Sequence, residues 1–343
     1  MRKRQQPTPT VTIYDVARDA GVSPATVSRV LSNPDIVTER TRAAVRRSVE
    51  QLGFSPNTAA KSLRNLRTRK LLVTVPDIAN PFFSLIIRGI EEAAQREGYA
   101  IVLGDTHLDA DREDRYAQML LQREVDGLIF LGHRMPARLV PWIKRRGASV
   151  PIVNGCEYSP GLGVPSVHID NTKAAAEAMH YLYGLGHRRI GVISGPLSSP
   201  LSRDRLQGVE QRARAQRAHR QLLLTTGDFT IESGIASAAE LFAKKEPPTA
   251  IFCFNDEMAI GVLDYAQRHG MTVPGDLSIV GFDDVRFGRY VRPALTTIGQ
   301  PMLDIGRETV RLLLGLIAGT ITRPISVTLP YKLEIRGSTG APL

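Results

Sequence analysis

Apolar and polar positions near the start of the chain alternate with the period of an α-helix. In the first such stretch the apolar side chains fall at positions i, i+3, i+4 and i+7, which are Ile13, Val16, Ala17 and Ala20. Gly21 is well placed to end this helix. Ser23 is a good N-cap for a second helix, and Pro24 is a good first helical residue. The inward positions of the second helix are Val27, Val30 and Leu31. Two short helices joined by a tight turn are therefore predicted.

A third amphipathic stretch runs from Thr38 to about Leu52 and is followed by Gly53, which is placed to end it. Its inner face comprises Val45, Val49 and Leu52. Three short helices with a tight turn between the first two form the helix-turn-helix arrangement. The pattern thus predicts a small helical domain at the N-terminus.

The outward positions of the second helix suit the reading of DNA. These positions are Pro24, Ala25, Ser28 and Arg29. In a helix-turn-helix the second helix lies in the major groove with its N-terminal residues against base edges, where Arg29 can bond to guanine O6 and N7. The alternative is an ordinary three-helix bundle with a solvated outer face. The distribution of charge decides between the two readings.

Positive charge is concentrated in this part of the chain. The 343 residues carry a formal net charge of +10. Residues 1–70 hold 14 Lys and Arg against 5 Asp and Glu, so +9 of the excess lies there and the rest of the chain is nearly neutral. A solvated basic tail would give the same composition. Together with the helix-turn-helix pattern, however, a basic small domain on a neutral large one favours a DNA partner.

From Lys70 onward, short apolar runs alternate with helical stretches. The apolar runs read LLVTVPD, AIVLGD, GLIFLG, PIVNG, SVHID, RIGVISG, LLLTTGD, AIFCFND and SIVGFDD. Helical patterns between them include residues 81–97, 172–184 and 256–268. Such alternation predicts parallel sheets covered by helices on both faces, and its length suggests two units. The predicted fold class is α/β with two parallel-sheet lobes behind the helical domain.

Several predicted strands end in a carboxylate, and aromatic residues lie next to the same ends. The carboxylates are Asp77, Asp105, Asp170, Asp228, Asp256 and Asp283. The aromatic residues are Phe82, Phe83, Phe229 and Phe282. The carboxyl ends of strands border the ligand crevice in open parallel sheets, and carboxylates accept hydrogen bonds from hydroxyl groups. We therefore predict a small, hydroxyl-rich and partly flat ligand. Some of these residues would cap helices instead, and for Asp256 the cap is the favoured interpretation.

Composition disfavours several classes of protein. No apolar run approaches the ~20 residues of a membrane span, and the basic start MRKRQQPTPT lacks the apolar stretch of a secretory signal. The two cysteines, Cys156 and Cys253, can build neither a disulfide framework nor a zinc cluster. We expect a cytoplasmic protein that needs no metal and no cofactor.

The N-terminal motifs resemble those of the LacI/GalR family of regulators. The stretch TIYDVARDAGVSPATVSRVLSN is similar to the family's DNA-binding signature, and LGFSPNTAAKSLR is similar to its hinge helix. The resemblance implies DNA contacts from Thr12, Tyr14, Ser23, Pro24, Ala25, Thr26, Ser28 and Arg29. In the hinge it implies DNA contacts from Asn57, Ala60, Lys61 and Leu63. In the family a hinge leucine, here Leu63, wedges between base pairs in the minor groove and kinks the duplex.

The large domain resembles the family's two-lobed, periplasmic-binding-protein-like sensor. The motifs that carry this likeness are HIDN, LGHRRIGVISGP, RLQG, FNDEMAIG and VPGDLSIVGFDD. The resemblance implies effector contacts from Phe82, Phe83, Asp170, Arg205, Phe229, Asn255 and Asp283. The stretches VPDIANPFFSLIIRGIE, SVHIDN, GDFT and IRGST are most similar to members that respond to a nucleoside, although the hinge follows the general family pattern.

These observations predict a division into domains. The expected segments are a DNA-binding domain at 1–54, a hinge helix and linker at 55–70, an effector-binding and dimerisation domain at 71–338, and a tail at 339–343. The arginine-rich stretch at 210–221 is read as the solvated face of a helix with Val209 and Ala213 inward, rather than as a second nucleic-acid patch. Residues 308–320 are read as a packed helix of the sensor domain.

Two other functions would use the same crevice. A nucleoside or sugar hydrolase would employ paired carboxylates as acid and base, but the sequence has no nucleophile elbow and no HExxH motif. A transport binding protein would carry a signal peptide and no basic head. We therefore predict a ligand-responsive transcription regulator, expected to act as a repressor under a nucleoside or sugar effector, and not an enzyme.

The operator and the assembly depend on the size of the DNA-binding unit. One helix-turn-helix unit reads few base pairs, so we expect a homodimer on a pseudo-palindromic double-stranded operator. Family members that form tetramers carry a leucine-repeat tail, and the residues after Ser338 contain none. A dimer rather than a tetramer is the resulting prediction.

Overall fold

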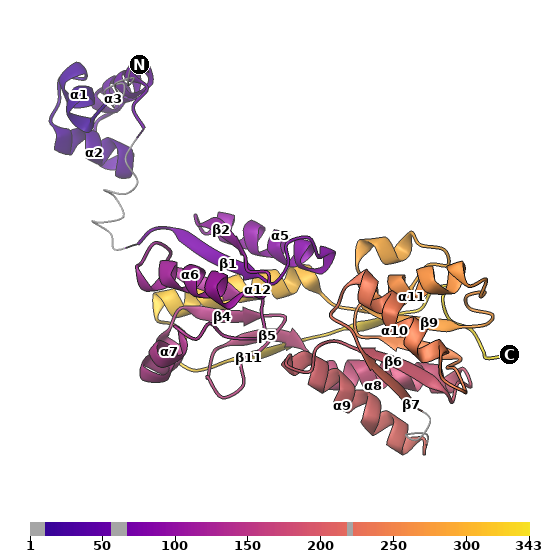
Figure 1. The fold of residues 1–343 in the computed structure, drawn as a ribbon. Coiled ribbons are helices and arrows are strands. Elements are labelled where there is room, and N and C mark those ends of the chain that lie inside the picture. The colour runs from indigo at the N-terminus through magenta and orange to yellow at the C-terminus, as the bar shows by residue number, and fades with distance from the viewer. Residues whose placement is uncertain (1–10, 56–66, 218–221) are drawn as a thin grey trace, which may run out of the picture. The chain divides into compact units, whose positions relative to one another are not determined.

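The computed structural model describes residues 11–55, 67–217 and 222–343. The chain divides into two compact units, Met1–Thr68 and Arg69–Leu343 (Figure 1). Buried apolar residues form separate cores within each unit. Among the helices in the described segments, none has both the length and the apolar character that a bilayer crossing requires.

The first unit is a bundle of short helices. Its elements are α1 (Ile13–Asp19), α2 (Pro24–Ser32), the 3₁₀ turn η1 (Pro34–Ile36) and α3 (Glu39–Leu52). The buried core consists of Val16, Ala17, Val27, Val30 and Val45. The three predicted helices and their inward faces are thus confirmed, and η1 is an addition that the apolar pattern did not predict.

The helix ends of this unit are fixed by their caps. Ser23 accepts a hydrogen bond from the Thr26 amide at 3.1 Å, and Pro24 opens α2. Gly53 ends α3 in the left-handed conformation, at φ +61°, which costs glycine little. The turn between α1 and α2 also contains a left-handed glycine, Gly21 at φ +65°.

The second unit contains two six-stranded sheets, one in each of two lobes. The sheet of lobe 1 has the order β11-β5-β4-β3-β1-β2 and is parallel throughout. Its strands are β1 (Lys70–Val75), β2 (Ala100–Asp105), β3 (Gly127–Phe130), β4 (Ile152–Gly155), β5 (Ser166–Ile169) and β11 (Ser326–Leu329). The sheet of lobe 2 has the order β12-β10-β9-β8-β6-β7. Its strands are β6 (Ile190–Ser194), β7 (Leu222–Thr226), β8 (Ala250–Cys253), β9 (Ser278–Asp283), β10 (Thr296–Gly299) and β12 (Lys332–Glu334).

Helices cover the sheet faces of each lobe, as Figure 1 shows. Those of lobe 1 are α5 (Pro81–Arg96), α6 (Ala110–Leu121), α7 (Val140–Arg146) and α12 (Met302–Ala318). Those of lobe 2 are α8 (Asn171–Gly184), α9 (Pro200–Ala215), α10 (Ile231–Phe242) and α11 (Asp256–Arg268). The described residues of this unit also include two short 3₁₀ turns, η2 (Gly147–Ser149) and η4 (Arg286–Arg289). Because the central strands are buried on both faces, they are continuous apolar runs rather than alternating ones.

The chain passes between the lobes three times. It crosses at Asp170 between β5 and α8, at Gln300 and Pro301 between β10 and α12, and at residues 330–331 between β11 and β12. Lobe 1 is therefore assembled from two separate parts of the sequence. Its α12 packs on α5 with backbone nearly touching backbone, since a Cβ at Gly306 would lie 2.2 Å from the carbonyl oxygen of Ile86.

All nine predicted strands are confirmed, and they pair in parallel in two separate sheets. Three further strands, β10, β11 and β12, were not predicted. Of these, β11 pairs with β5 and β12 with β10, so both owe their conformation to segments distant in sequence. One of them, β12, pairs antiparallel with β10 and departs from the parallel prediction. The inward positions Val209 and Ala213 of α9 are buried, as expected, and the end of the arginine-rich stretch, 218–221, lies outside the described residues.

Candidate functional site

The outer surface of α2 presents the predicted DNA-reading side chains. Ala25 and Arg29 are exposed, and Pro24, Thr26 and Ser28 are partly exposed. Within the part of the chain that the structure describes, Arg29 makes no side-chain hydrogen bond or ion pair, so its guanidinium can bind an external acceptor. Tyr14 on α1 is 67% exposed, which is unusual for an aromatic side chain of this size.

Two of the predicted DNA contacts also have a role within the fold. The Thr12 hydroxyl donates to Asp15 at 2.7 Å, and the Thr12 amide donates to the same carboxylate at 2.9 Å. Ser23 caps α2. Both residues are exposed at helix N-termini, where free amides suit a phosphate oxygen. The hinge residues Asn57, Ala60, Lys61 and Leu63 lie outside the described residues.

Arg205 is the centre of the polar groups between the two lobes. It stands on α9 and is 4% exposed. Its Nε donates to Asn171 Oδ1 at 2.8 Å, its Nη1 donates to the carbonyl of Phe254, and its guanidinium lies 3.6 Å from the centre of the Phe282 ring. Burial lowers the pKa of Arg205 from its usual range. These contacts hold the group rigidly and leave Nη2 without a hydrogen bond among the described residues.

Asp283 ends β9 and is 5% exposed, in a left-handed conformation at φ +120°. Gln300, at the second crossing between the lobes, donates to its Oδ1 at 2.7 Å. Burial raises the pKa of the Asp283 carboxyl to about 7, and the positive charge of Arg205 opposes the rise. A carboxyl held in this way can accept from a ligand hydroxyl, and strained backbone of this kind is common at binding sites.

Phe229 and Asn255 form a second pair in lobe 2. Asn255 caps α11 by accepting from the Met258 amide at 2.9 Å, and its Nδ2 donates to the Phe229 carbonyl at 2.8 Å. The Phe229 ring lies so close to Gly195 that a Cβ there would be 2.0 Å from it. Phe229 is half-buried, so part of its ring face is available to a flat ligand.

The predicted residues of lobe 1 are less available. Phe82 is buried in the core, and Phe83 packs edge-on against it with 5.2 Å between ring centres. Asp170 caps α8 and forms an ion pair with Lys173 at 2.9 Å. These two bonds occupy much of the acceptor capacity of Asp170.

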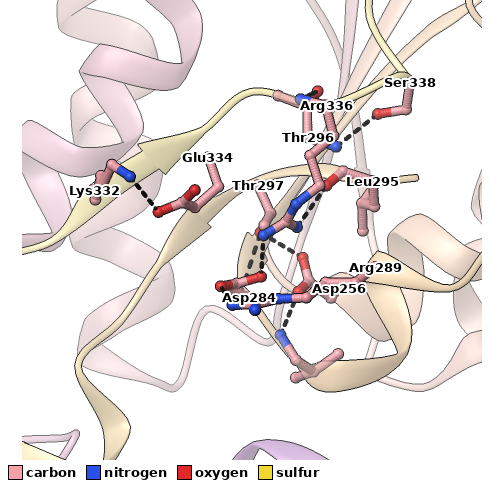
Figure 2. Close-up of polar contacts among 11 residues, drawn as sticks. Asp256, Asp284, Arg289, Leu295, Thr296, Thr297, Lys332, Glu334, Arg336 and Ser338 are labelled. Atoms are coloured by element: carbon pink, nitrogen blue, oxygen red, sulfur yellow. Dashed lines mark hydrogen bonds and ion pairs between the residues drawn. The ribbon is translucent and has the colours of Figure 1, made fainter. Parts of the chain in front are cut away.

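The structure corrects the interpretation of Asp256 as a helix cap. The cap is Asn255, and Asp256 is fully buried within the first turn. Its two oxygens accept from the Val285 amide at 2.8 Å and from the Thr297 hydroxyl at 2.6 Å (Figure 2). Asp256 therefore ties α11 to β10 and to the loop that follows β9.

Figure 2 shows how that loop is held. Asp284 accepts from Arg289 and from Arg336, each at 2.6 Å. Arg336 in turn donates to the Leu295 carbonyl at 2.8 Å. These bonds immobilise the residue next to Asp283, so the position of the Asp283 carboxyl is fixed by groups of the protein itself.

The remaining strand-end carboxylates of the sequence prediction bond to groups in their own turns or loops. Asp77 accepts from the Ala79 amide, and Asp228 accepts from Thr230, so both stabilise their own turns. Asp105 pairs with His107 at 2.7 Å. The structure thus brings Arg205 and Asp283 together between the lobes, whereas the carboxylates of the edge strands β2 and β7 serve locally.

Sequence reasoning missed Glu157, which links the lobes. Glu157 follows β4, is 8% exposed, and accepts at Oε1 from the Ser199 hydroxyl of lobe 2 at 2.9 Å. Burial raises its pKa to about 8. Next to it, Tyr158 donates to Asp204 at 3.0 Å, again across the lobes. The sequence signal that could have identified Glu157 is its position two residues after Gly155, the last residue of β4. We use the name interlobe cluster for the set Glu157, Ser199, Arg205, Phe229, Asn255 and Asp283.

The possible metal ligands of the described residues are dispersed. Over the described segments, no group of three or more His, Cys, Asp or Glu side chains is placed to hold a metal ion. Cys156 and Cys253 are free and buried, and burial raises the pKa of both thiols.

Comparison with known proteins gives matches to both units. Residues 12–57 match the bacterial regulatory proteins of the lacI family, and residues 179–339 match a periplasmic binding protein-like domain. The HTH-type transcriptional repressor CytR of Escherichia coli (strain K12) is 41% identical over 342 residues, which is 99% of this chain and 99% of that protein.

Solved structures give a similar result. The lac repressor dimer bound to operator and the anti-inducer ONPF matches with a TM-score of 0.87 at 28% identity, over 97% of this chain and 100% of that one. A LacI family transcriptional regulator from Enterococcus faecium with bound ribose matches with a TM-score of 0.70 at 29% identity, over 79% of this chain and 99% of that one.

Proposed function

The chain belongs to the lacI family of bacterial regulatory proteins, and from this membership we propose that it is a transcriptional repressor controlled by a nucleoside bound at the interlobe cluster. It is a DNA-binding regulator, and its relatives are regulators and not enzymes. The observation that carries the proposal is the buried pair of Arg205 and Asp283, held rigidly between the lobes of a unit joined to a DNA-binding head.

Recognition of the operator is assigned to α2 and the hinge. Arg29 is exposed on the outer face of α2 and has no partner among the described residues, and bidentate contact with guanine is the commonest specific use of such a side chain. Thr12, Tyr14 and Ser23 are exposed at or near the N-termini of α1 and α2 and are assigned to the phosphate backbone. The hinge residues, among them the wedge Leu63, keep the roles that the family resemblance implies.

The chemistry of the interlobe cluster supports a nucleoside effector. Arg205 Nη2 and Asp283 offer a donor and an acceptor to adjacent ribose hydroxyls, and the half-buried Phe229 ring offers a face to a flat base. The ribose-bound regulator from Enterococcus faecium has the same fold and carries one half of such a ligand. Sequence motifs similar to those of the cytidine-responsive repressor make cytidine the first ligand to test.

Control of DNA binding requires only that the effector prefers one arrangement of the lobes. The contacts of Glu157 with Ser199 and of Tyr158 with Asp204 cross between the lobes and must change if the lobes move. A ligand bonded to Arg205 and Asp283 acts on the same elements. Whether the effector weakens or strengthens operator binding depends on which arrangement of the lobes allows the DNA-binding heads to contact the operator.

The oligomeric state and the cellular location of the protein are inferred from its DNA partner. Two half-sites are needed for useful specificity, and a twofold dimer supplies two heads. The lac repressor dimer on its operator, to which this chain is similar, has this form. Because the partner is chromosomal DNA, we place the protein in the cytoplasm.

The proposal is tested by a ligand screen on the full chain. Thermal shift with nucleosides, pentoses and hexoses should show one ligand class that raises the melting temperature. At 100 times its Kd, such a ligand adds about 2.7 kcal/mol to the free energy of unfolding. The same ligand should change operator affinity in a fluorescence anisotropy titration. A chain that binds operator but responds only to hexoses would contradict the nucleoside effector while leaving the repressor function intact.

A further inference from the structure

Two consecutive residues at the end of β9 have backbone conformations that residues with a side chain rarely adopt. Asp283 has φ +120° and Asp284 has φ +58°. Such conformations cost free energy, and a fold keeps them only where neighbouring contacts hold them in place. The contacts that hold this turn therefore determine where the Asp283 carboxyl lies.

The carboxylate of Asp284 is held from two sides, and only 11% of its side chain is exposed. Its Oδ1 accepts from Nη2 of Arg336 and its Oδ2 accepts from Nη2 of Arg289, each at 2.6 Å (Figure 2). We use the name Asp284 clamp for these three residues. Because both oxygens already pair with an arginine, the Asp284 carboxylate serves the turn rather than a ligand.

The two arginines of the Asp284 clamp come from different parts of the chain. Arg289 belongs to η4, and 59% of its side chain is exposed. Arg336 follows β12, donates to the Leu295 carbonyl at 2.8 Å, and donates through its backbone amide to the Thr296 hydroxyl at 2.9 Å. Arg336 therefore fastens the turn to the start of β10, and the Asp284 clamp lies wholly within lobe 2.

The Asp283 carboxyl keeps one oxygen for a ligand. Its Oδ1 accepts from Gln300 at 2.7 Å, and no hydrogen bond to its Oδ2 is found in the described segments. Burial raises the pKa of Asp283 to about 7, so both protonation states are present near neutral pH, and in either state the carboxyl can bond to a hydroxyl group. Since Gln300 fixes one oxygen only, the direction of Oδ2 depends on the backbone of the turn.

Resting on the proposed function, we propose that Asp284 is a positioning residue of the effector site, where its pairs with Arg289 and Arg336 hold the turn that aims the Asp283 carboxyl at a ribose hydroxyl. The ligand chemistry that it serves is a pentose hydroxyl, carried by a nucleoside or by the free sugar. Because the Asp284 clamp lies within one lobe, it sets how tightly the ligand binds, and the effect of bound ligand on operator affinity is independent of it.

The test begins with calorimetric titration of the full chain with cytidine, 2′-deoxycytidine and 3′-deoxycytidine. The wild type should bind cytidine about 10-fold more tightly than the deoxynucleoside that lacks the hydroxyl bonded to Asp283, a usual effect of one hydrogen bond in a binding site. If the chain binds ribose and no nucleoside, ribose and its 2-deoxy and 3-deoxy forms replace the three probes. Operator titrations with and without saturating ligand accompany each measurement.

Asp284→Asn removes the charge but keeps the size of the side chain, and asparagine tolerates a left-handed backbone. The variant should bind cytidine roughly 10-fold more weakly, and its preference for cytidine over the deoxynucleoside should fall close to one, because the Asp283 carboxyl is no longer aimed at the hydroxyl. The change in operator affinity at saturating cytidine should match that of the wild type.

Two further variants guard against a general loss of structure. Arg289→Gln removes one of the two pairs at an exposed position, so it should fold and show a smaller loss of the same kind. Glu92→Gln is the matched control, because it breaks an ion pair of 3.1 Å with Arg307 between distant segments of lobe 1 and should bind all ligands as wild type does. Operator binding without ligand reports whether each variant is folded.

The outcomes distinguish this inference from the function on which it rests. Equal weakening of cytidine and both deoxynucleosides in Asp284→Asn and Arg289→Gln would overturn the inference alone. So would variants that bind as wild type, a wild type that does not distinguish the three nucleosides, or an Asp284→Asn variant in which saturating cytidine no longer changes operator affinity. Failure of every nucleoside and of ribose to bind the wild type would overturn the proposed effector, and this inference with it.

Discussion

At the scale of single residues, a few buried polar side chains carry the proposed function because their neighbours fix them. Arg205 is bonded on two sides and stacked on Phe282, and Asp283 is held by Gln300. Arg29 is the opposite case, a side chain exposed to water whose proposed partner is outside the protein. A mutation at Arg205 or Asp283 therefore breaks internal bonds as well as the proposed ligand contacts, whereas a mutation at Arg29 removes only the proposed contact with DNA.

Arg29→Ala should weaken specific operator binding by about 1–3 kcal/mol and flatten the preference at one base pair of each half-site. The reason is the loss of a bidentate contact, with no loss of internal structure. Electrophoretic mobility or anisotropy titrations on operator and random DNA measure both effects. Equal losses on the two DNAs would show instead that Arg29 contacts only phosphate.

Arg205→Ala or Asp283→Ala should abolish the ligand response while operator binding persists. Each change leaves a buried polar partner unsatisfied and removes a ligand contact, a loss of at least about 2 kcal/mol in ligand binding. Calorimetric titration with the effector measures ligand binding, and the change in operator affinity on adding the effector measures the response. If both variants titrated as wild type, the ligand would have to bind elsewhere.

Because of the Glu157 carboxyl, the free energy of unfolding should fall as the pH rises. Its pKa is raised in the folded state, so the folded chain keeps this proton longer than the unfolded chain does. The contribution is fully present below the ordinary value of about 4.5 and is lost as the pH approaches about 8. Asp283, with its pKa raised to about 7, acts in the same direction. Within the window each carboxyl contributes a slope of up to about 1.4 kcal/mol per pH unit.

Thermal unfolding of wild type and Glu157→Gln at pH 5, 6, 7 and 8 measures this slope. The variant has no carboxyl to titrate and should show a shallower decline. Parallel curves for the two proteins would mean that Glu157 stays ionised in the folded state.

At the scale of secondary structure, the sequence predicted what local patterns encode and missed what distant segments create. The helices of the first unit and nine strands follow from apolar periodicity and from capping residues such as Ser23. Strand β12 does not, because three residues gain their strand conformation only by pairing with β10. Contacts between distant residues were missed in the same way. Asp256 bonds to Val285 and Thr297, and Glu157 bonds to Ser199, and these partners are far from them in sequence.

The packing of α12 on α5 gives a prediction at this scale. Gly306→Ala would place a Cβ 2.2 Å from the Ile86 carbonyl oxygen, so the helices must separate at a cost of roughly 1–3 kcal/mol. Thermal or urea unfolding of the full chain measures the loss. Gly184→Ala is a matched control in α8, since a Cβ there meets nothing within 4 Å. Similar stability changes in the two variants would refute the close contact.

At the scale of the whole molecule, charge and symmetry determine how DNA is bound. The first 70 residues carry nearly all of the net positive charge, and the large unit is almost neutral. Binding should therefore weaken steeply with salt, as each phosphate contact releases a counterion. The basic heads repel each other, so the neutral unit is expected to hold the two copies together.

The predicted dimer is checked by sedimentation or light scattering at micromolar concentration. Two chains should be found both free and on a pseudo-palindromic operator, with one head for each half-site. A control operator with one half-site scrambled should bind far more weakly. Monomers that bind the two operators equally would contradict the dimer, and a stable tetramer would show an additional interface.

The three passages of the chain between the lobes have a consequence for synthesis on the ribosome. The helical head is complete once residue 54 has emerged, and every residue of its core precedes that point. Lobe 1 has no such independence, because α12 supplies Val310, Leu312, Leu313 and Leu316 to a core begun by β1. More than two hundred residues must be translated between these partners. The nascent chain thus carries a finished helical bundle while its first sheet still lacks the covering helix α12, and apolar surface exposed at such a stage is prone to aggregation.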